Sequence, residues 1–267
     1  MHPIALSIAG SDPSGGAGIQ ADLKTFQQFG VFGTTVIVAI TAQNTRGVRA
    51  VHAVPAEMVS AQLDALADDL PPAAFKSGML ATAPLVRLIA AELEARRWTG
   101  YVLDPVMVST SGDRLLDVEA EAVVRDLLLP LATLVTPNLD EAEILTHQTV
   151  RDPSAMERAG RRLVELGAGA ALIKGGHLPG EIMTDVLVSP AGVRRFTRAK
   201  LETTSTHGTG CTLSAAITAG LALGRPLDHA VTDALDFVHR AMIAAPGLGA
   251  GRGPLNHMVP AAQPASS

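Results

Sequence analysis

The sequence predicts an α/β fold built around a mostly parallel central sheet that is covered by helices on both faces. Short apolar runs alternate with longer amphipathic stretches through most of the chain, which is the order typical of βαβ units. The apolar runs have the character of buried strands, and strands buried on both faces are typical of parallel sheets. We therefore expect right-handed crossover connections.

The first strand is predicted over Ile4–Ala9, an apolar run that Gly10 and Ser11 interrupt. The later apolar runs predict strands over Thr35–Ile40, Ala74–Ser77, Tyr101–Asp104, Leu134–Thr136 and Ala171–Lys174. The amphipathic stretches between them predict helices over Ala17–Phe29, Ala56–Ala67, Pro84–Arg97, Glu119–Leu128, Asp140–Thr146 and Ser154–Leu166.

The pattern changes near residue 183. Asp185–Ser189 and Arg194–Arg198, joined across a Pro-Ala-Gly turn, predict an antiparallel hairpin at the edge of the sheet. Two helices are then expected, over Thr209–Leu223 and Asp228–Ala244.

Composition limits the classes of function. Among the 267 residues we find no internal repeat and no interdomain linker, so we expect one domain over residues 1–258, followed by a disordered tail over 259–267. A net charge of −5 gives no basic field for nucleic acid or membranes. One cysteine, no secretory signal and no apolar run long enough to span a bilayer favour a cytoplasmic protein.

Polar, glycine-rich segments follow the predicted strands. Ligands of such sheets bind beyond the carboxyl ends of the strands, so these segments are expected to converge on one site. They are Gly10–Gly18, Thr41–Thr45, Ser77–Met79, Asp104–Gly112, Thr136–Glu141 and Lys174–His177.

The segment Gly208–Cys211 precedes a helix of small residues. Its glycines permit close approach of a ligand, and a helix N-terminus offers unpaired N–H groups and partial positive charge to a phosphate. The same field is expected to lower the pKa of the Cys211 thiol and so make it a proton acceptor or nucleophile. The alternative is a tightly packed helix start with Cys211 as a buried apolar residue. His207 and His177 lack metal-ligand spacing.

Four residues after other strands each allow a structural and a functional interpretation. Asn138 and Glu141 match a capping box, which these residues alone favour, while Glu141 also suits the water shell of Mg²⁺. Asp104 is either a turn initiator or a second acid near the metal. Lys174 either neutralises phosphate oxygens or lies in solvent.

Two polar residues could recognise a heterocycle. Asp22 lies near the start of the first helix, where it either favours the helix dipole or, facing the site, accepts from an amino group. Gln43 either serves a turn or reads a heterocycle edge. A nicotinamide site is excluded, because positions 38–44 hold no acid for the ribose.

Eight segments in order and at matching spacing resemble the hydroxymethylpyrimidine/phosphomethylpyrimidine kinases of thiamine biosynthesis, within the ribokinase-like superfamily. The resemblance runs from Ile8 to about His257. The segments are Ala9–Asp22, Thr41–Thr45, Lys76–Leu80, Asp104–Val108, Thr136–Glu143, Lys174–His177, His207–Cys211 and Gly253–His257.

The resemblance implies a ribokinase-like three-layer α/β/α sandwich, a homodimer, and a kinase that uses ATP and Mg²⁺. It implies that Asp22 and Gln43 hold the aminopyrimidine, that Met79 and Val106 line its pocket, and that Gly208–Cys211 is the anion hole. Gly10 is expected in the same pocket, Thr209, Asn138 and Lys174 at the nucleotide, and Asp104 and Glu141 (through water) at the metal. Catalysis is assigned to Cys211, Gly208, Gly210 and Lys174.

The implied reaction phosphorylates 4-amino-5-hydroxymethyl-2-methylpyrimidine to its monophosphate and then to the diphosphate. The partner is thus a small pyrimidine, with no nucleic acid and no membrane. Some members of the family carry a lysine in the loop where this chain reads Ser109–Gly112, which leaves Lys174 as the main cation. The alternatives are a pyridoxal/pyridoxine kinase and a catalytically inactive nucleotide-binding regulatory protein.

Overall fold

The computed structural model describes residues 2–107, 116, 118–176 and 178–261. Within these residues nine strands form one sheet. In chain order they are β1 (Ile4–Ser11), β2 (Phe32–Asn44), β3 (Gly47–Ala53), β4 (Ala74–Ser77), β5 (Tyr101–Leu103), β6 (Leu134–Val135), β7 (Ala171–Ile173), β8 (Ile182–Ser189) and β9 (Gly192–Ala199).

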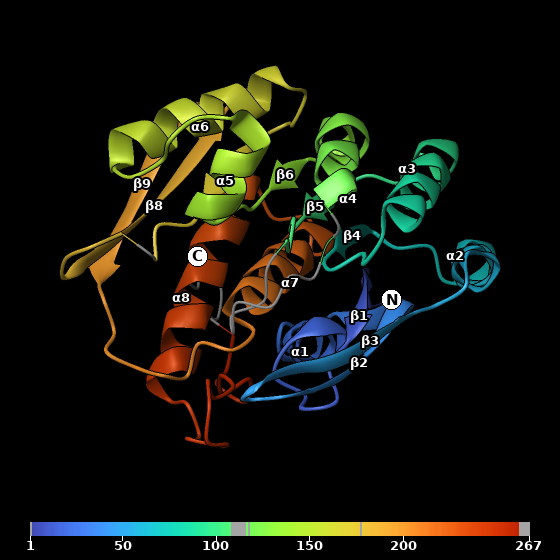
Figure 1. Ribbon diagram of the computed structural model, residues 1–267, viewed down its shortest axis with the longest axis horizontal. Coiled ribbons are helices and arrows are strands. Elements are labelled where there is room, and N and C mark those ends of the chain that lie inside the picture. The colour runs from blue at the N-terminus through green and yellow to red at the C-terminus, as the bar shows by residue number, and fades with distance from the viewer. Residues whose placement is uncertain (1, 108–115, 117, 177, 262–267) are drawn as a thin grey trace.

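The strand order across the sheet is β3-β2-β1-β4-β5-β6-β7-β8-β9. The pairs from β2 to β7 are parallel, whereas β3 pairs antiparallel with β2, and β8 pairs antiparallel with both β7 and β9. The predicted parallel sheet with an antiparallel edge hairpin is therefore confirmed, and it has a second antiparallel edge at β3 (Figure 1).

Helices cover both faces of the sheet (Figure 1). Two separate apolar cores lie between them and the strands. One core includes α1 (Gly18–Gln28), α7 (Thr209–Ala222) and α8 (Leu227–Ile243). The other includes α2 (Ala56–Asp69), α3 (Ala83–Arg96), α4 (Val118–Val123), α5 (Leu139–Thr146) and α6 (Pro153–Glu165). These layers confirm the predicted α/β/α sandwich.

Consecutive residues of the strands belong to opposite cores. Ala5 and Val102 pack on the side of α1, α7 and α8, whereas their neighbours Leu6 and Leu103 pack on the other side. Strand side chains alternate between faces with a period of two, so a strand buried on both sides must be apolar at nearly every position. This requirement explains why the apolar runs could be recognised as strands.

The second strand differs most from its prediction. β2 continues to Asn44, so the segment Thr41–Thr45 is mostly strand and only its end lies in the turn that leads to β3. β3 was not predicted, because most of its residues are exposed and its sequence has no buried apolar face. Gln43 therefore lies on a paired strand and not in a loop.

An aromatic cluster lies toward the amino end of β5. The rings of Phe75 and Tyr101 stack with centroids 4.8 Å apart, and Trp98 meets Phe75 edge-on at 5.9 Å. The Arg96 guanidinium lies 5.6 Å from the centre of the Trp98 ring. Trp98 precedes the strand, so it lies away from the carboxyl ends where the polar segments follow.

Two predicted loops extend beyond the described residues. Positions 109–112 lie outside them, as do His177 and residues 262–267 of the predicted tail. Earlier in that tail, Arg240 Nη1 donates to the carbonyl oxygen of Pro260 at 2.7 Å. Among the described residues, no helix has both the length and the apolarity needed to cross a membrane.

Candidate active site

The carboxyl ends of the parallel strands bring several predicted residues to one edge of the sheet. Asp104 follows β5, Asn138 lies between β6 and α5, and Lys174 follows β7. Asn138 and Lys174 form an isolated parallel bridge that continues the pairing of β6 and β7. The edge therefore forms as the sequence predicts, since parallel strands end side by side.

Lys174 lies in a cluster of acids and not in solvent. Its Nζ is 3.1 Å from Asp104 Oδ1 and 4.0 Å from Glu141 Oε2, and both carboxylates are buried. Burial alone would raise the pKa of Asp104, but Lys174 and Lys76 hold that pKa below its ordinary value. Burial opposes the charge of Lys174 as well, yet Asp104 and Glu141 raise its pKa. Asp104 and Lys174 are therefore held as an ion pair, with Glu141 beside it.

Glu141 caps α5 and also places a carboxyl group beside Lys174. Its backbone N–H donates to Asn138 Oδ1 at 2.9 Å, and its Oε2 accepts from the Asn138 N–H at 2.8 Å, which confirms the predicted capping box of α5. Its Oε1 also accepts from the N–H of Met107 at 3.3 Å. Burial raises the pKa of Glu141, and Lys174 opposes that rise. The cap thus holds a carboxylate in place beside the cation.

The N-terminus of α7 faces this cluster. A Cβ on Gly210 would lie 3.3 Å from Lys174 Nζ and 3.6 Å from Asp104 Oδ2. Ser214 Oγ, one turn further along α7, donates to Asp104 Oδ2 at 3.2 Å. The absence of a side chain at position 210 leaves the first N–H groups of the helix next to a lysine, which is an arrangement suited to phosphate oxygens.

Gly208 is the N-cap of α7 and has φ of 80°, in the left-handed region that favours glycine. A Cβ there would overlap the carbonyl oxygen of Gly16, in the loop after β1. Thr209 begins the helix, and its Oγ1 donates to the Thr206 carbonyl at 3.1 Å. Only glycine at position 208 lets these two loops touch.

A buried pair fixes the same two loops. His207 Nε2 lies 2.8 Å from Asp12 Oδ2, and Asp12 also accepts from the N–H groups of Ser14 and Ala17 at 2.8 and 2.9 Å. Hydrogen bonds from His207 and Ser14 lower the pKa of Asp12 although burial opposes this. The charge on Asp12 therefore holds the start of α7 against the start of α1.

Cys211 lies in the first turn of α7, as predicted, but its expected low pKa is wrong. Burial raises the pKa of the Cys211 thiol to about 11, and the carboxylates of Asp22 and Asp104 add to the rise. Lys76 and a backbone hydrogen bond from Gly18 oppose it without reversing it. Desolvation therefore outweighs the helix field at this residue.

A second group of predicted residues lies on the side of β1 and β4. Met79, which follows β4, packs in a small apolar cluster with Ala39 and Ala81, and Val106 packs against it. A Cβ on Gly10 would lie 2.8 Å from Met79 Cε, so the bare backbone of β1 makes room for the methionine. The structure thus brings Gly10, Met79 and Val106 together, and their role as walls of one pocket stays a prediction.

Asp22 lies on α1 and is fully buried. Its Oδ1 lies 2.9 Å from Lys76 Nζ, and its Oδ2 accepts from Ser7 Oγ at 2.5 Å. Burial raises the pKa of Asp22, and these two partners oppose that rise. Both carboxylate oxygens are therefore held by neighbouring strands.

Gln43 is half-buried at the far end of β2. Thr41 Oγ1 lies 3.1 Å from Gln43 Oε1 and 2.9 Å from the Ser11 carbonyl, so the amide is tied to the end of β1. Within the described residues, no hydrogen bond joins Gln43 to Asp22. The structure brings Gln43 to the correct edge but does not join it to the rest of the predicted pyrimidine site.

No role was predicted from the sequence for Lys76, Ser214 or the pair of Asp12 and His207. Lys76 offered a signal, because it is the one charged residue in the short buried strand β4. Ser214 and the Asp12–His207 pair offered none, since their partners lie 110 and 195 positions away in the chain.

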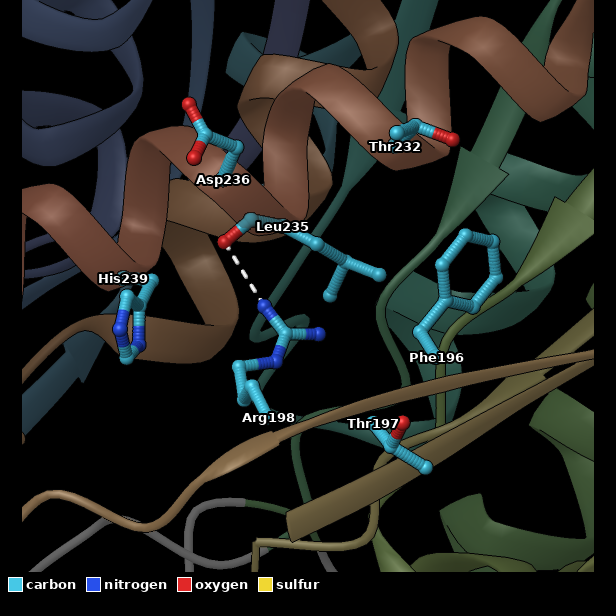
Figure 2. A pocket seen from close by; sticks show the side chains of 7 residues that line it. All are labelled: Phe196, Thr197, Arg198, Thr232, Leu235, Asp236 and His239. Carbon is cyan, nitrogen blue, oxygen red and sulfur yellow. Dashed lines mark hydrogen bonds between the residues drawn. The ribbon is translucent and has the colours of Figure 1, made fainter.

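A hollow of about 330 Å³ lies between β9 and α8 (Figure 2). Figure 2 shows Arg198 between the two elements, with its Nη1 donating to the Leu235 carbonyl at 2.9 Å. The same guanidinium pairs with Asp185 at 2.7 Å, and Asp185 accepts from the N–H of Gly175 at 2.9 Å. None of the predicted site residues lines this hollow, but this chain of contacts supports the backbone next to Lys174.

Over the part of the chain that the structure describes, no group of three or more His, Cys, Asp or Glu side chains could hold a metal ion.

Comparisons with known proteins find similar proteins over nearly the whole chain. Residues 12–256 match the family described as phosphomethylpyrimidine kinase. A hydroxymethylpyrimidine/phosphomethylpyrimidine kinase of Rhizobium meliloti is 52% identical over 260 residues, which cover 96% of this chain and 97% of that protein. The thiamine biosynthesis bifunctional protein ThiED of Geobacter sulfurreducens is 46% identical over 256 residues, which cover 96% of this chain and 52% of that protein. The solved ADP complex of Bacillus subtilis pyridoxal kinase has a TM-score of 0.89 and 36% identity, covering 96% of this chain and 98% of that one.

Proposed function

This chain belongs to the phosphomethylpyrimidine kinase family and has the ribokinase-like fold, and we propose that it transfers phosphoryl groups from ATP in thiamine biosynthesis. The first acceptor is the hydroxymethyl group of hydroxymethylpyrimidine. The second is the resulting monophosphate, which becomes the diphosphate. The activities named for the Rhizobium and Geobacter relatives support the kinase, its two acceptors and the pathway.

The observation that carries this proposal is the position of Lys174 and Asp104 against Gly210 at the start of α7. Phosphoryl transfer needs little covalent help from the protein and depends mostly on positioning and charge stabilisation. The helix N-terminus supplies N–H donors and partial positive charge, and Lys174 supplies a full charge. Thr209 and Asn138, at the starts of α7 and α5, are proposed nucleotide contacts on the same edge.

Mg²⁺ fits the donor set at this edge. Asp104 and Glu141 are both buried beside Lys174, so two carboxyl groups share one ammonium and offer oxygen ligands for a further cation. Mg²⁺ takes few protein carboxylates and binds mainly to water and nucleotide phosphates. We therefore assign Asp104 and Glu141 to it, Glu141 through water. Bound there, the ion would neutralise charge on the transferring phosphoryl group.

The two proposed steps make different demands on the same residues. An alcohol must lose a proton as its oxygen attacks, so a base such as Cys211 assists the first step. A monophosphate is already largely ionised near neutrality, because its second pKa is about 6. It needs no strong base, but it needs cations such as Lys174 to offset its repulsion from ATP.

Pyridoxal remains a second candidate acceptor, because the pyridoxal kinase of Bacillus subtilis has nearly the same fold over nearly the whole chain. The identity to a hydroxymethylpyrimidine/phosphomethylpyrimidine kinase is higher, at 52% against 36%. We therefore expect hydroxymethylpyrimidine to be the better substrate.

The deciding experiment is product analysis. The purified protein is incubated with ATP and Mg²⁺ and with hydroxymethylpyrimidine, pyridoxal or no acceptor, and products are separated by mass. We expect the monophosphate first and the diphosphate later, with ATP consumption that depends on the pyrimidine. ATP consumption that no acceptor changes, or phosphorylation of pyridoxal alone, would overturn the proposal. Lys174→Ala is the control for contaminating kinases.

A homodimer remains a prediction that rests on the family resemblance, and a cytoplasmic location remains a prediction that rests on the composition of the sequence. Light scattering of the purified protein at several concentrations tests the first. Microscopy or fractionation of the tagged protein tests the second.

A further inference from the structure

Lys76 is a charged side chain in the middle of the sheet. It lies on β4, between β1 and β5, and has no exposed surface. Removing an ammonium from water is costly unless other groups compensate. Burial alone would lower the pKa of Lys76, but Asp22, Cys211 and Asp104 raise it above its ordinary value. The ammonium therefore stays charged inside the protein.

Its immediate partner is Asp22. Ser7 and Lys76 are register partners on β1 and β4, and they lie on the face of the sheet that α1 covers. From this face both reach the same carboxylate, Ser7 at Oδ2 and Lys76 at Oδ1. A carboxylate held at both oxygens has one orientation. Each oxygen still has a second lone pair for another donor.

The Lys76 ammonium also lies close to a segment that is predicted to form the acceptor pocket. A Cβ on Gly78 would lie 3.7 Å from Lys76 Nζ, and Gly78 is joined to Met79, a predicted wall of that pocket. An ammonium has three N–H donors, and Asp22 is its one hydrogen-bond acceptor among the described residues. Lys76 and Asp22 therefore form a buried ion pair next to Gly78, the neighbour of the predicted pocket wall Met79.

We propose that Lys76 is a positioning residue that sets acceptor specificity, because its ion pair aims the Asp22 carboxylate so that it accepts from the amino group of the acceptor ring. This inference rests on the proposed function. Hydroxymethylpyrimidine carries a ring amino group that can donate to such a carboxylate. Pyridoxal carries no amino group; its ring nitrogen donates only when protonated, and its phenolic oxygen, when ionised, is repelled by a second anion. The pair thus favours the aminopyrimidine.

Lys76→Met removes the charge and keeps most of the length of the side chain. Without the ammonium, Asp22 is expected to take a proton and to become a donor as well as an acceptor. We expect kcat/KM for hydroxymethylpyrimidine to fall about tenfold or more, the loss typical when a charged hydrogen bond is removed. The preference for hydroxymethylpyrimidine over pyridoxal should fall by a similar factor, and the KM for ATP should change less than about twofold.

Three further variants separate specificity from folding. Lys76→Arg keeps the charge and should retain most of the preference. The double variant Lys76→Met/Asp22→Asn leaves no buried charge uncompensated, so it tests specificity if the single variant does not fold. Lys200→Met is the matched control, because Lys200 Nζ donates to the Leu178 carbonyl outside the proposed site. Where pyridoxal is not turned over, its inhibition constant replaces kcat/KM.

An unchanged preference in Lys76→Met and in the double variant, whether both activities fall equally or neither falls, would overturn the inference and leave Lys76 a structural residue. These outcomes differ from failure of the proposed function, in which the unmodified protein itself phosphorylates no hydroxymethylpyrimidine.

Discussion

Cys211 shows how two physical effects compete at one residue. A helix N-terminus favours a thiolate by about 0.3–1 kcal/mol, which motivated the expected low pKa. Burial and two nearby carboxylates act in the opposite direction, and the pKa rises to about 11. At neutral pH only about one thiol in ten thousand would be ionised. Before any substrate binds, this residue is therefore almost entirely protonated.

Cys211→Ala should impair phosphorylation of the alcohol more than phosphorylation of the monophosphate, because only the alcohol must lose a proton. A base acts when deprotonated, so with a pKa of about 11 the alcohol step of the unmodified protein should accelerate about tenfold per pH unit near neutrality. The variant should lose this dependence. Single-turnover rates with each acceptor across pH provide the measurement, and equal losses in both steps would contradict the role.

Lys174→Ala should slow both steps, and the monophosphate step at least as much as the alcohol step. The variant removes the cation beside Asp104 and Glu141 and leaves two buried carboxylates facing the phosphates. A loss of about a hundredfold or more is expected for a residue that stabilises transition-state charge. Rates with each acceptor at saturating ATP provide the measurement, with Lys200→Ala as the control. A larger effect on the alcohol step would argue against this assignment.

At the scale of single residues, the sequence predicted contacts between chain neighbours better than contacts between residues that are far apart in the chain. The capping box of Asn138 and Glu141 was predictable because both partners lie within one helical turn. The partner of Lys76 was not, because Asp22 lies 54 positions away and meets it only after β4 pairs with β1. Local patterns specify local contacts, whereas buried ion pairs depend on the assembled sheet.

Among the elements, α7 and β3 differ in how strongly their sequences specify them. α7 begins where two glycines and a run of small residues require it, and most of its residues are buried. β3 pairs along one edge only and is largely exposed, so no apolar pattern distinguishes it from a loop. Strands buried on both faces were predicted because they are apolar at nearly every position, and β3 was missed because it lacks that pattern.

The C-terminal segment docks on α7 through a buried histidine. His257 Nε2 and Thr212 Oγ1 share a hydrogen bond of 2.9 Å. Burial lowers the pKa of His257 to about 4, and the charge of Lys24 adds to the effect. The folded protein therefore holds this imidazole neutral, whereas in the unfolded chain its pKa is about 6.5.

This difference predicts a loss of stability in acid. A depressed pKa contributes stability that is fully present above about pH 6.5 and is lost as the pH falls toward about 4, by on the order of 2–3 kcal/mol. His257→Gln cannot titrate, so its melting temperature should fall less over this range than that of the unmodified protein. Calorimetry at several pH values makes the comparison, and identical losses in both proteins would contradict the prediction.

Across the whole molecule, the two proposed half-sites come from different parts of one sheet. The acceptor half lies at β1, β2 and β4, and the phosphoryl half lies at the ends of β5, β6 and β7. α7 packs against β1, β4 and β5, so its N-terminus stands between the halves. The fold class followed from the order of strands and polar segments, whereas the division into acceptor and phosphoryl residues followed from the family resemblance. The second antiparallel edge, which carries part of the acceptor half, was not predicted.

Because the acceptor half and the phosphoryl half are separate, Gln43→Ala should weaken binding of the acceptor and leave binding of ATP nearly unchanged. The KM for hydroxymethylpyrimidine should rise by about tenfold, the usual cost of an unpaired polar group on a ligand, while the KM for ATP should change little. Steady-state kinetics with each substrate varied in turn gives both values. Unchanged pyrimidine affinity would remove Gln43 from the acceptor site, and a raised KM for ATP would contradict the division.

The aromatic cluster at the amino end of β5 has a practical consequence. Trp98 is the single tryptophan of the chain, and it is packed against Phe75 and Arg96, away from the edge where substrates are proposed to bind. Its fluorescence should therefore follow the loss of packing around β4 and β5 and respond little to nucleotide or pyrimidine. One optical signal can thus separate variants that unfold from variants that fold but do not bind, without any label.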